Sequence, residues 1–331
     1  MPHQQWNIEE LQSEIESIRQ RVLQVGAGLN QYFVEKQELI ELMIISTIAQ
    51  EPLLIVGAPG TAKSDLIIKF CEAIGVSGTD YFEYMLSKFS EPSEILGPVD
   101  INEMRQGAYV RRIEGKLPTA KIAFLDEIFK SNSAILNTLL TVINERKFYQ
   151  DGRPHEIPLR MLFAATNDIP EFSELLALRD RFTLKIESSS VRESHFDELI
   201  LRGLRNDTYR QLGQRPWVNL ASLEDFEKLH VYLEHRILRS VESEDLRDRA
   251  FPPTEYALFR RILRTLERED NVVVSDRKVI KLFKLIQIRA FLLRGGVVIR
   301  EDLMLLSYIA DRLVDFEPVR QKVRTLLHIR R

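Results

Sequence analysis

The chain has 331 residues, of which 44% are hydrophobic and 29% are charged, a globular composition that suits one large domain or two modest ones. The formal net charge is −3 and the pI is near 6.2, so the overall charge does not favour nucleic acid as the main partner. Cys71 is the single cysteine, and no apolar run approaches the length of a membrane span or a signal peptide, so we expect a soluble cytoplasmic protein without an internal disulfide.

The first half of the chain alternates helical and strand patterns. Apolar residues recur every three or four positions over 8–25 and again over 36–49, which predicts two helices. A continuous apolar run at 52–56 is typical of a strand buried on both faces. Further strands are expected at 81–86, 121–125, 159–165 and 182–186. Because helical patterns separate most of them, as at 133–144, we expect a parallel sheet with helices on both faces.

Two stretches interrupt this alternation. Residues 91–115 carry a candidate hairpin turn at positions 106 and 107. Residues 147–157 contain Asp151 followed by Gly152, a dipeptide typical of two-residue hairpin turns. Strand patterns fade after about residue 190 and helical patterns continue to the end, so we place a domain boundary within 187–190.

A glycine-containing loop joins the first expected strand to an amphipathic helix. It fits the phosphate-binding pattern G-x-x-x-x-G-K-[ST] except at one position. Its residues are Gly57, Ala58, Pro59, Gly60, Thr61, Ala62, Lys63 and Ser64. In such a loop the backbone N–H groups face a phosphate, the lysine adds a positive charge and the serine hydroxyl binds Mg²⁺. The loop predicts a site for ATP and Mg²⁺, and we include Leu66, in the following helix, among the expected nucleotide contacts.

The departure from the pattern is Ala62, which stands where the pattern has its second glycine. A side chain there requires backbone angles that a Cβ atom tolerates. We expect such angles because position 62 already enters the helix. The alternative is a turn that binds nothing, and the buried strand before the loop and the helix after it argue against that.

An apolar strand at 122–127 ends in two carboxylates, Asp126 and Glu127. At the carboxyl end of a parallel strand, the aspartate can order Mg²⁺ and the glutamate can orient and deprotonate the attacking water. A solvated acidic strand end is the alternative. The presence of both acids after a phosphate loop predicts ATP hydrolysis.

Polar residues also stand next to the following two strands. Asn167 comes after the strand at 159–165, where its amide could touch the γ-phosphate or the attacking water; an Asx turn is the alternative. Arg179 and Arg181 precede the last strand, where an arginine can reach a neighbouring subunit's nucleotide. A surface ion pair with Asp180 is the alternative. These residues alone leave both choices open.

These segments together resemble the MoxR family of AAA+ ATPases, and its RavA-like branch most closely. The resemblance covers residues 53–182 and rests on the runs FEYMLSKFSEPSEILGPVDI (82–101), GKLP (115–118), FLDEIFK (124–130), AILNTLL (134–140), NER (144–146) and AATN (164–167). A sparser likeness, VSDRK at 274–278, is similar to the segment of that branch that carries sensor 2.

The resemblance implies roles for the residues that match its motifs. Asn167 would be sensor 1 and Arg277 would be sensor 2, acting either on its own subunit's nucleotide or on a neighbour's. Arg181 would be the arginine finger, with Arg179 as its rival.

The same resemblance implies an architecture and partners. Residues 91–115 would be the helix-2 insert and 147–157 the pre-sensor 1 hairpin, both on the pore side of a ring. The family implies hexameric rings, chaperone-like remodelling of proteins, partners with von Willebrand factor A domains, and work in complex maturation or metal-cofactor insertion. RavA has a long accessory region beyond its lid, and partner recognition through that region is not carried over to this chain.

We therefore expect an α/β fold with three parts: an N-terminal helical segment at 1–35, an AAA+ αβα domain with a five-stranded parallel sheet at 36–190, and an all-α lid at 191–331. The expected function is an ATP-hydrolysing ring motor that remodels a protein partner. The alternatives are a DNA-associated motor, for which the sequence offers no winged helix, zinc motif or basic face, a P-loop kinase, and a nucleotide-switched assembly scaffold with little turnover.

Overall fold

A five-stranded sheet forms the centre of the structure, which is a computed structural model describing residues 6–172, 175–243, 250–270 and 272–329. Its strands are β1 (Leu53–Val56), β2 (Tyr81–Met85), β3 (Ile122–Asp126), β6 (Met161–Thr166) and β7 (Leu184–Glu187). They lie in the order β2-β3-β6-β1-β7, and every neighbouring pair is parallel. This confirms the parallel α/β sheet, with strand ends that differ from the expected ones by at most two residues.

The two faces of the sheet belong to two different hydrophobic cores, because successive side chains of a strand point to opposite faces. In β1, Leu53 and Ile55 enter one core while Leu54 and Val56 enter the other. Helices that contribute to the first core are α1 (Ile8–Leu29), α2 (Gln37–Ala49) and α3 (Lys63–Ala73). Helices that contribute to the second are α4 (Pro92–Leu96), α6 (Ser133–Glu145) and α7 (Leu176–Arg181).

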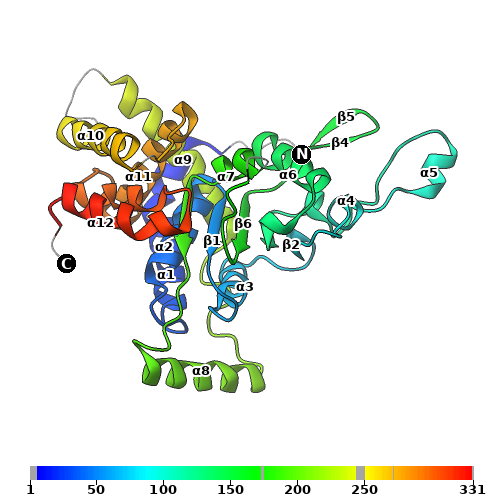
Figure 1. The fold of residues 1–331 in the computed structure, drawn as a ribbon, viewed down its shortest axis with the longest axis horizontal. Coiled ribbons are helices and arrows are strands. Elements are labelled where there is room, and N and C mark those ends of the chain that lie inside the picture. Colours follow the sequence, from blue (N-terminus) through cyan, green and yellow to red (C-terminus); the bar gives the residue numbers. More distant parts are fainter. Residues whose placement is uncertain (1–5, 173–174, 244–249, 271, 330–331) are drawn as a thin grey trace.

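After β7 the described residues form helices and connecting loops (Figure 1). The α-helices are α8 (Phe196–Gln211), α9 (Leu223–Glu242), α10 (Pro253–Glu269), α11 (Asp276–Arg294) and α12 (Phe316–Leu326). Two 3₁₀ segments, η6 (Arg300–Tyr308) and η7 (Leu313–Asp315), lie between α11 and α12. None of the helices in the described residues has the length and apolarity that crossing a membrane requires. The helices that follow β7 confirm the expected helical lid.

The lid packs against the first face of the nucleotide-binding part, along α2. Ion pairs of 2.6 Å join Lys281 to Glu51 and Arg289 to Glu41, so α11 runs antiparallel to α2. Apolar residues of α9, α10, α11 and α12 belong to the same core as α1 and α2. Because this core is continuous, the boundaries expected at 35 and 190 stay predictions.

Two excursions project together from the β2 side of the sheet (Figure 1). The expected hairpin at 147–157 is confirmed: β4 (Lys147–Gln150) pairs antiparallel with β5 (Arg153–Glu156). The hairpin expected around positions 106 and 107 is confirmed in part: the chain turns there, and an antiparallel bridge joins Val99 to Arg111. The short helix α5 (Ile101–Arg105) lies between the two arms, with Asp100 accepting a hydrogen bond from the Asn102 backbone N–H. A side chain that satisfies one of the first N–H groups favours a helical turn at this tip.

Candidate nucleotide-binding site

The loop at 57–64 leaves β1 at the carboxyl edge of the sheet and is fastened to the two neighbouring strands. The Gly57 N–H donates to the Thr166 carbonyl (3.0 Å), and the Ser188 Oγ donates to the Thr61 carbonyl (3.0 Å). A Cβ atom on Gly57 would lie 2.5 Å from the carbonyl oxygen of Ser188. Such an approach to backbone leaves room for glycine alone, so this position holds the loop close to β7.

Ala62 adopts a conformation that the sequence reasoning did not expect. Its φ is +63° and its ψ is +20°, so it lies in the left-handed region and caps α3 rather than entering the helix. The loop must turn its backbone inward here, and a Cβ atom in this region costs about 1–2 kcal/mol. The expectation that a Cβ is tolerated without strain at position 62 is therefore wrong.

Two buried lysines converge on the loop. Lys63 donates to the carbonyls of Gly57 (2.5 Å) and Ala58 (3.1 Å), and Lys36, at the N-terminus of α2, donates to the Ser189 carbonyl (2.8 Å). Burial lowers the pKa of Lys63, although the nearby Asp126 and Glu127 carboxylates oppose the shift. Burial and then the charge of Lys63 lower the pKa of Lys36. Two lysines with lowered pKa values beside one loop, at the N-terminus of α3, fit an anion such as a phosphate.

Glu127 follows Asp126 at the end of β3 and is almost fully buried, with 5% of its surface exposed. Its Oε1 accepts hydrogen bonds from Asn167 Nδ2 (2.6 Å) and Lys130 Nζ (2.9 Å). Its Oε2 is buried and has no hydrogen-bond partner. An unpaired buried acceptor costs about 1–3 kcal/mol, and a water molecule that donates to it would remove that cost.

The structure thus brings Lys63, Asp126, Glu127 and Asn167 to one edge of the sheet. Asp126 accepts from the backbone N–H of Glu127 through Oδ1 (2.8 Å), and Ser64 lies in the first turn of α3. Their expected role as Mg²⁺ ligands stays a prediction. The side chain of Leu66 is fully buried in the core beneath α3, so its contact with a nucleotide also stays a prediction.

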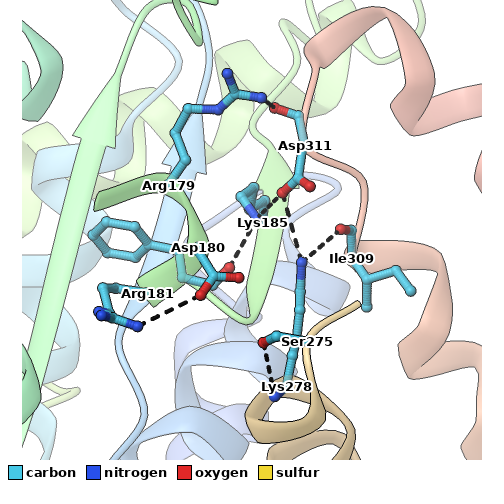
Figure 2. Close-up of polar contacts among 9 residues, drawn as sticks. Arg179, Asp180, Arg181, Lys185, Ser275, Lys278, Ile309 and Asp311 are labelled. Carbon is cyan, nitrogen blue, oxygen red and sulfur yellow. Dashed lines mark hydrogen bonds and ion pairs between the residues drawn. The ribbon is translucent and has the colours of Figure 1, made fainter. Parts of the chain in front are cut away.

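The two rival finger arginines have different surroundings (Figure 2). Arg179 is buried, and its guanidinium donates to the Asp311 carbonyl in the lid (3.0 Å) and to the Pro170 carbonyl (3.4 Å). The Arg181 side chain is 21% exposed, and its ion pair is a 3.5 Å contact with the adjacent Asp180. Arg179 therefore joins α7 to the lid through its hydrogen bonds. Within the described residues, the guanidinium of Arg181 is held only by the long ion pair with Asp180.

Arg277 lies far from the loop of its own chain. It is exposed in the first turn of α11, and the adjacent Lys278 is buried against Asp311 and the Ile309 carbonyl. That end of α11 lies beside the C-terminus of α2, where Lys281 pairs with Glu51. The loop lies beside the N-terminus of α2, where Lys36 is close to Lys63. The 13 residues of α2 separate the two positions by roughly 20 Å. The structure does not bring Arg277 together with Lys63 and Glu127.

Sequence reasoning missed two cations at this site. Lys130 lies three residues after Glu127, in a 3₁₀ turn. This short spacing in the sequence was the signal that could have identified Lys130 as a partner of Glu127. Lys36 gave no local signal, because it reaches the loop only through the packing of α2.

Comparison with known proteins places the chain in a family. The family model of the MoxR domain in MoxR–vWA–beta-propeller ternary systems matches residues 20–228, and a model of an AAA lid domain matches residues 256–319. An uncharacterised protein of Methanocaldococcus jannaschii is 34% identical over 282 residues, which are 85% of this chain and 69% of that protein. The chaperone MoxR1 of Mycobacterium tuberculosis is 26% identical over 198 residues, 59% of this chain and 50% of that protein.

A second uncharacterised protein of Methanocaldococcus jannaschii is 40% identical over 184 residues, which are 55% of this chain and 46% of that protein. A solved structure of a protein from Cytophaga hutchinsonii shares the fold, with a TM-score of 0.69 at 14% identity over 98% of both chains. The MoxR match takes in the loop, both carboxylates, Asn167 and Arg181, and the lid match takes in Arg277. The chain belongs to the MoxR family of AAA+ ATPases.

Proposed function

We propose that the protein is an ATP-driven ring motor that hydrolyses ATP between neighbouring subunits and uses the cycle to remodel a protein partner. The observation that carries the proposal is the hydrogen bond of 2.6 Å between Asn167 and the buried Glu127, at the sheet edge that also holds Lys63. A carboxylate oriented by an amide beside a phosphate loop is what activation of an attacking water requires.

The residues divide the chemical work as follows. Lys63 leaves its two backbone carbonyls and binds the β- and γ-phosphate oxygens, with Lys36 adding a second charge nearby. Mg²⁺, when bound, neutralises phosphate charge, and the Ser64 hydroxyl and Asp126 carboxylate are the oxygen ligands that fit it. Glu127 accepts the proton of the attacking water through Oε2, while Asn167 holds Oε1 in place.

The arginines act in trans within a homo-oligomeric ring, which we propose to be a hexamer. Arg181 precedes β7 by three residues, whereas the loop follows β1, the parallel neighbour of β7. The two therefore lie at opposite ends of the strand pair, about 20 Å apart at 3.3 Å per residue. Arg277 lies near the same end of β7 as Arg181, because the adjacent Lys278 contacts Asp311, which pairs with Lys185 of β7. Both arginines therefore suit a neighbouring subunit's nucleotide better than their own.

The partner we propose is a von Willebrand factor A-type protein, in the cytoplasm. The support is the matching family model, which describes MoxR domains of MoxR–vWA–beta-propeller systems, and a relative that is named a chaperone. A RavA-like role in complex maturation or metal-cofactor insertion is part of the same proposal and rests on the sequence resemblance.

Glu127→Gln tests the proposed hydrolysis. Because glutamine keeps the hydrogen bond to Asn167 but cannot take a proton, we expect ATP to bind as in the wild type and turnover to fall by about 100-fold or more. Steady-state phosphate release and ATP titration measure the two effects. Lys63→Ala is the matched control and is expected to lose binding itself. Wild-type turnover by Glu127→Gln would contradict the role of Glu127, and capture of no vWA protein by the ATP-bound Glu127→Gln protein would contradict the partner.

A further inference from the structure

Helix α10 carries a basic face on the surface of the lid. A groove of about 420 Å³ runs along this helix, which supplies the residues that line it. The basic face consists of four exposed residues of the groove: Arg260, Arg261, Arg264 and Arg268. In Figure 1, α10 lies at the edge of the lid, at the opposite end of the molecule from α5. The basic face therefore belongs to a surface separate from the two excursions.

The amphipathic pattern of α10 creates this face. On the other side of the helix, apolar residues are buried in the core: Phe259, Ile262, Leu263 and Leu266. Because the arginines are interleaved with these residues in the sequence, only the helical fold gathers them on one side. We expected no basic face from the sequence, and for α10 this expectation is wrong.

The four guanidinium groups have no ion-pair or hydrogen-bond partner among the described residues. Cations of α11, the next helix along the chain, differ in this respect. Lys281, Lys284 and Arg289 each pair at 2.6 Å with a carboxylate of another segment. The charge of α11 is thus used within the chain, whereas the charge of the basic face is available to a second molecule.

The spacing along the basic face is that of a contact between two helices. Ala257, Arg261, Arg264 and Arg268 follow one another at the alternating intervals of four and three residues that line the contact between two packed helices. Thr265, beside this line, donates from Oγ1 to the Arg261 carbonyl (2.9 Å), so its hydroxyl is already used. At 1.5 Å per residue the line is about 16 Å long, and carboxylates at the same spacing could each accept a charge-assisted hydrogen bond.

We propose that the basic face of α10 binds an acidic helical segment of a partner protein. A nucleic acid fits less well, because Glu267 and Glu269 lie on the same helix beside the arginines and would repel phosphates. Four arginines are also fewer than the roughly six to ten phosphate contacts of a typical DNA-binding protein. The basic face lies outside the proposed ATP site, so binding there does not depend on hydrolysis.

Two isomeric peptides test the match of spacing. Both are alanine-rich helices of about 20 residues with the same glutamate content; the single-face peptide has its glutamates at intervals of four and three, and the other has them spread around the helix. Fluorescence anisotropy with the full chain measures each Kd. We expect the single-face peptide to bind about five-fold more tightly or better, and to weaken as salt is added. Equal Kd values, or no binding of the single-face peptide up to about 1 mM, would overturn the proposal.

The double variant Arg261→Gln and Arg264→Gln tests the location. Glutamine has a helix propensity close to that of arginine, so the variant should fold and hydrolyse ATP as the wild type does. We expect its Kd for the single-face peptide to rise about ten-fold. The control, Arg105→Gln with Arg153→Gln, removes the same charge from exposed positions of α5 and β5 and should stay within about two-fold of the wild type. Equal losses in both double variants would overturn the role of α10.

Two other outcomes would assign the basic face differently and overturn the acidic partner. One is tighter binding of a duplex oligonucleotide than of the single-face peptide, lost in the α10 double variant. The other is loss of the oligomer in that variant, measured by light scattering with ATP, which would make the face a contact between subunits. Glu127→Gln should bind the peptide as the wild type does, so failure of this site and failure of the proposed hydrolysis are distinguishable.

Discussion

At the scale of single residues, Ala62 combines strain with a position on the phosphate loop. Its φ of +63° is rarely adopted by residues with a Cβ atom, yet its neighbours are tightly held, with Lys63 buried and Thr61 bonded to Ser188. The loop is thus held in a left-handed turn by its surroundings rather than by the local preference of alanine.

Ala62→Gly is expected to stabilise the protein. Glycine removes a cost of about 1–2 kcal/mol in the left-handed region and adds a smaller entropic cost in the unfolded chain, so the net gain should be below about 1 kcal/mol. Thermal unfolding without nucleotide measures it, and ATP affinity should be equal or higher. A lower midpoint for Ala62→Gly would show that the left-handed conformation carries no strain here.

Asn167 is expected to affect turnover without affecting binding. Its amide is one of two donors to Oε1 of Glu127, and the other, Lys130, belongs to a side chain that is 57% exposed and less firmly held. Asn167→Ala should therefore lower kcat by about 100-fold while the Kd for ATP stays nearly constant. Parallel turnover and titration experiments measure the two constants. A rise in Kd with unchanged kcat would mean that Asn167 serves binding instead.

At the scale of elements, β7, α11 and the segment after η6 meet around one carboxylate (Figure 2). Asp311 lies 2.9 Å from Lys185 Nζ and 3.6 Å from Lys278 Nζ, and its carbonyl accepts from Arg179. Two lysines therefore flank one carboxylate, and an arginine binds the main-chain carbonyl of the same residue, in a largely buried junction between the sheet and the lid. Burial and then the charge of Lys278 lower the pKa of Lys185 to about 7.

The depressed pKa of Lys185 predicts a pH-dependent contribution to stability. Between pH 7 and 10.5 the unfolded chain binds a proton at this lysine that the folded chain does not, so the free energy of unfolding rises with pH across that window. Lys185→Met should remove this slope and be more stable than the wild type at pH 7, by about 1–3 kcal/mol, because Asp311 keeps Lys278 and Arg179 as partners. Denaturant unfolding at pH 7 and at pH 9.5 measures the difference, which should shrink at the higher pH.

Asp311→Asn is the matched control for the same junction. It removes the carboxylate and leaves three buried cations facing one another, so it should destabilise the protein at pH 7. If Lys185→Met and Asp311→Asn destabilise to the same extent, the cluster acts as a balanced ion pair and the excess of positive charge has no energetic effect.

Elements defined by local pattern could be predicted from the sequence, whereas contacts between distant segments could not. The run at 52–56 and the carboxylates after 122–125 carry their signals within a few residues, so β1, β3 and the residues at their ends were located correctly. Two positions depend on tertiary packing. Ala62 is left-handed in a loop that the Ser188 side chain contacts at Thr61, and Arg277 is placed by the antiparallel packing of α11 on α2. Lys36 likewise reaches the loop only where α2 packs beside it.

At the scale of the whole molecule, one chain does not bring Arg181 to its own phosphate loop. The loop, Asp126, Glu127 and Asn167 lie at the carboxyl edge of the sheet, while Arg181 lies beyond the opposite end of β7. A contact between the carboxyl edge of one subunit and the Arg181 corner of the next joins two different surfaces. Such head-to-tail interfaces generate rings when the rotation closes. The position of Arg181 is thus understandable if two subunits share each nucleotide.

Mixing two inactive variants tests that arrangement. Lys63→Ala cannot bind ATP but retains Arg181, and Arg181→Ala binds ATP but lacks the finger, so each alone should show almost no turnover. In an equal mixture that exchanges subunits at random, about a quarter of the interfaces pair an intact loop with an intact arginine, and turnover should return in proportion. Phosphate release measured against the mixing ratio, with Arg179→Ala in place of Arg181→Ala as the control, decides the point. Because Arg179 is bonded to the lid of its own chain, its variant should lose stability rather than a trans contact. Rescue with Arg179→Ala and none with Arg181→Ala would reverse the assignment of the finger.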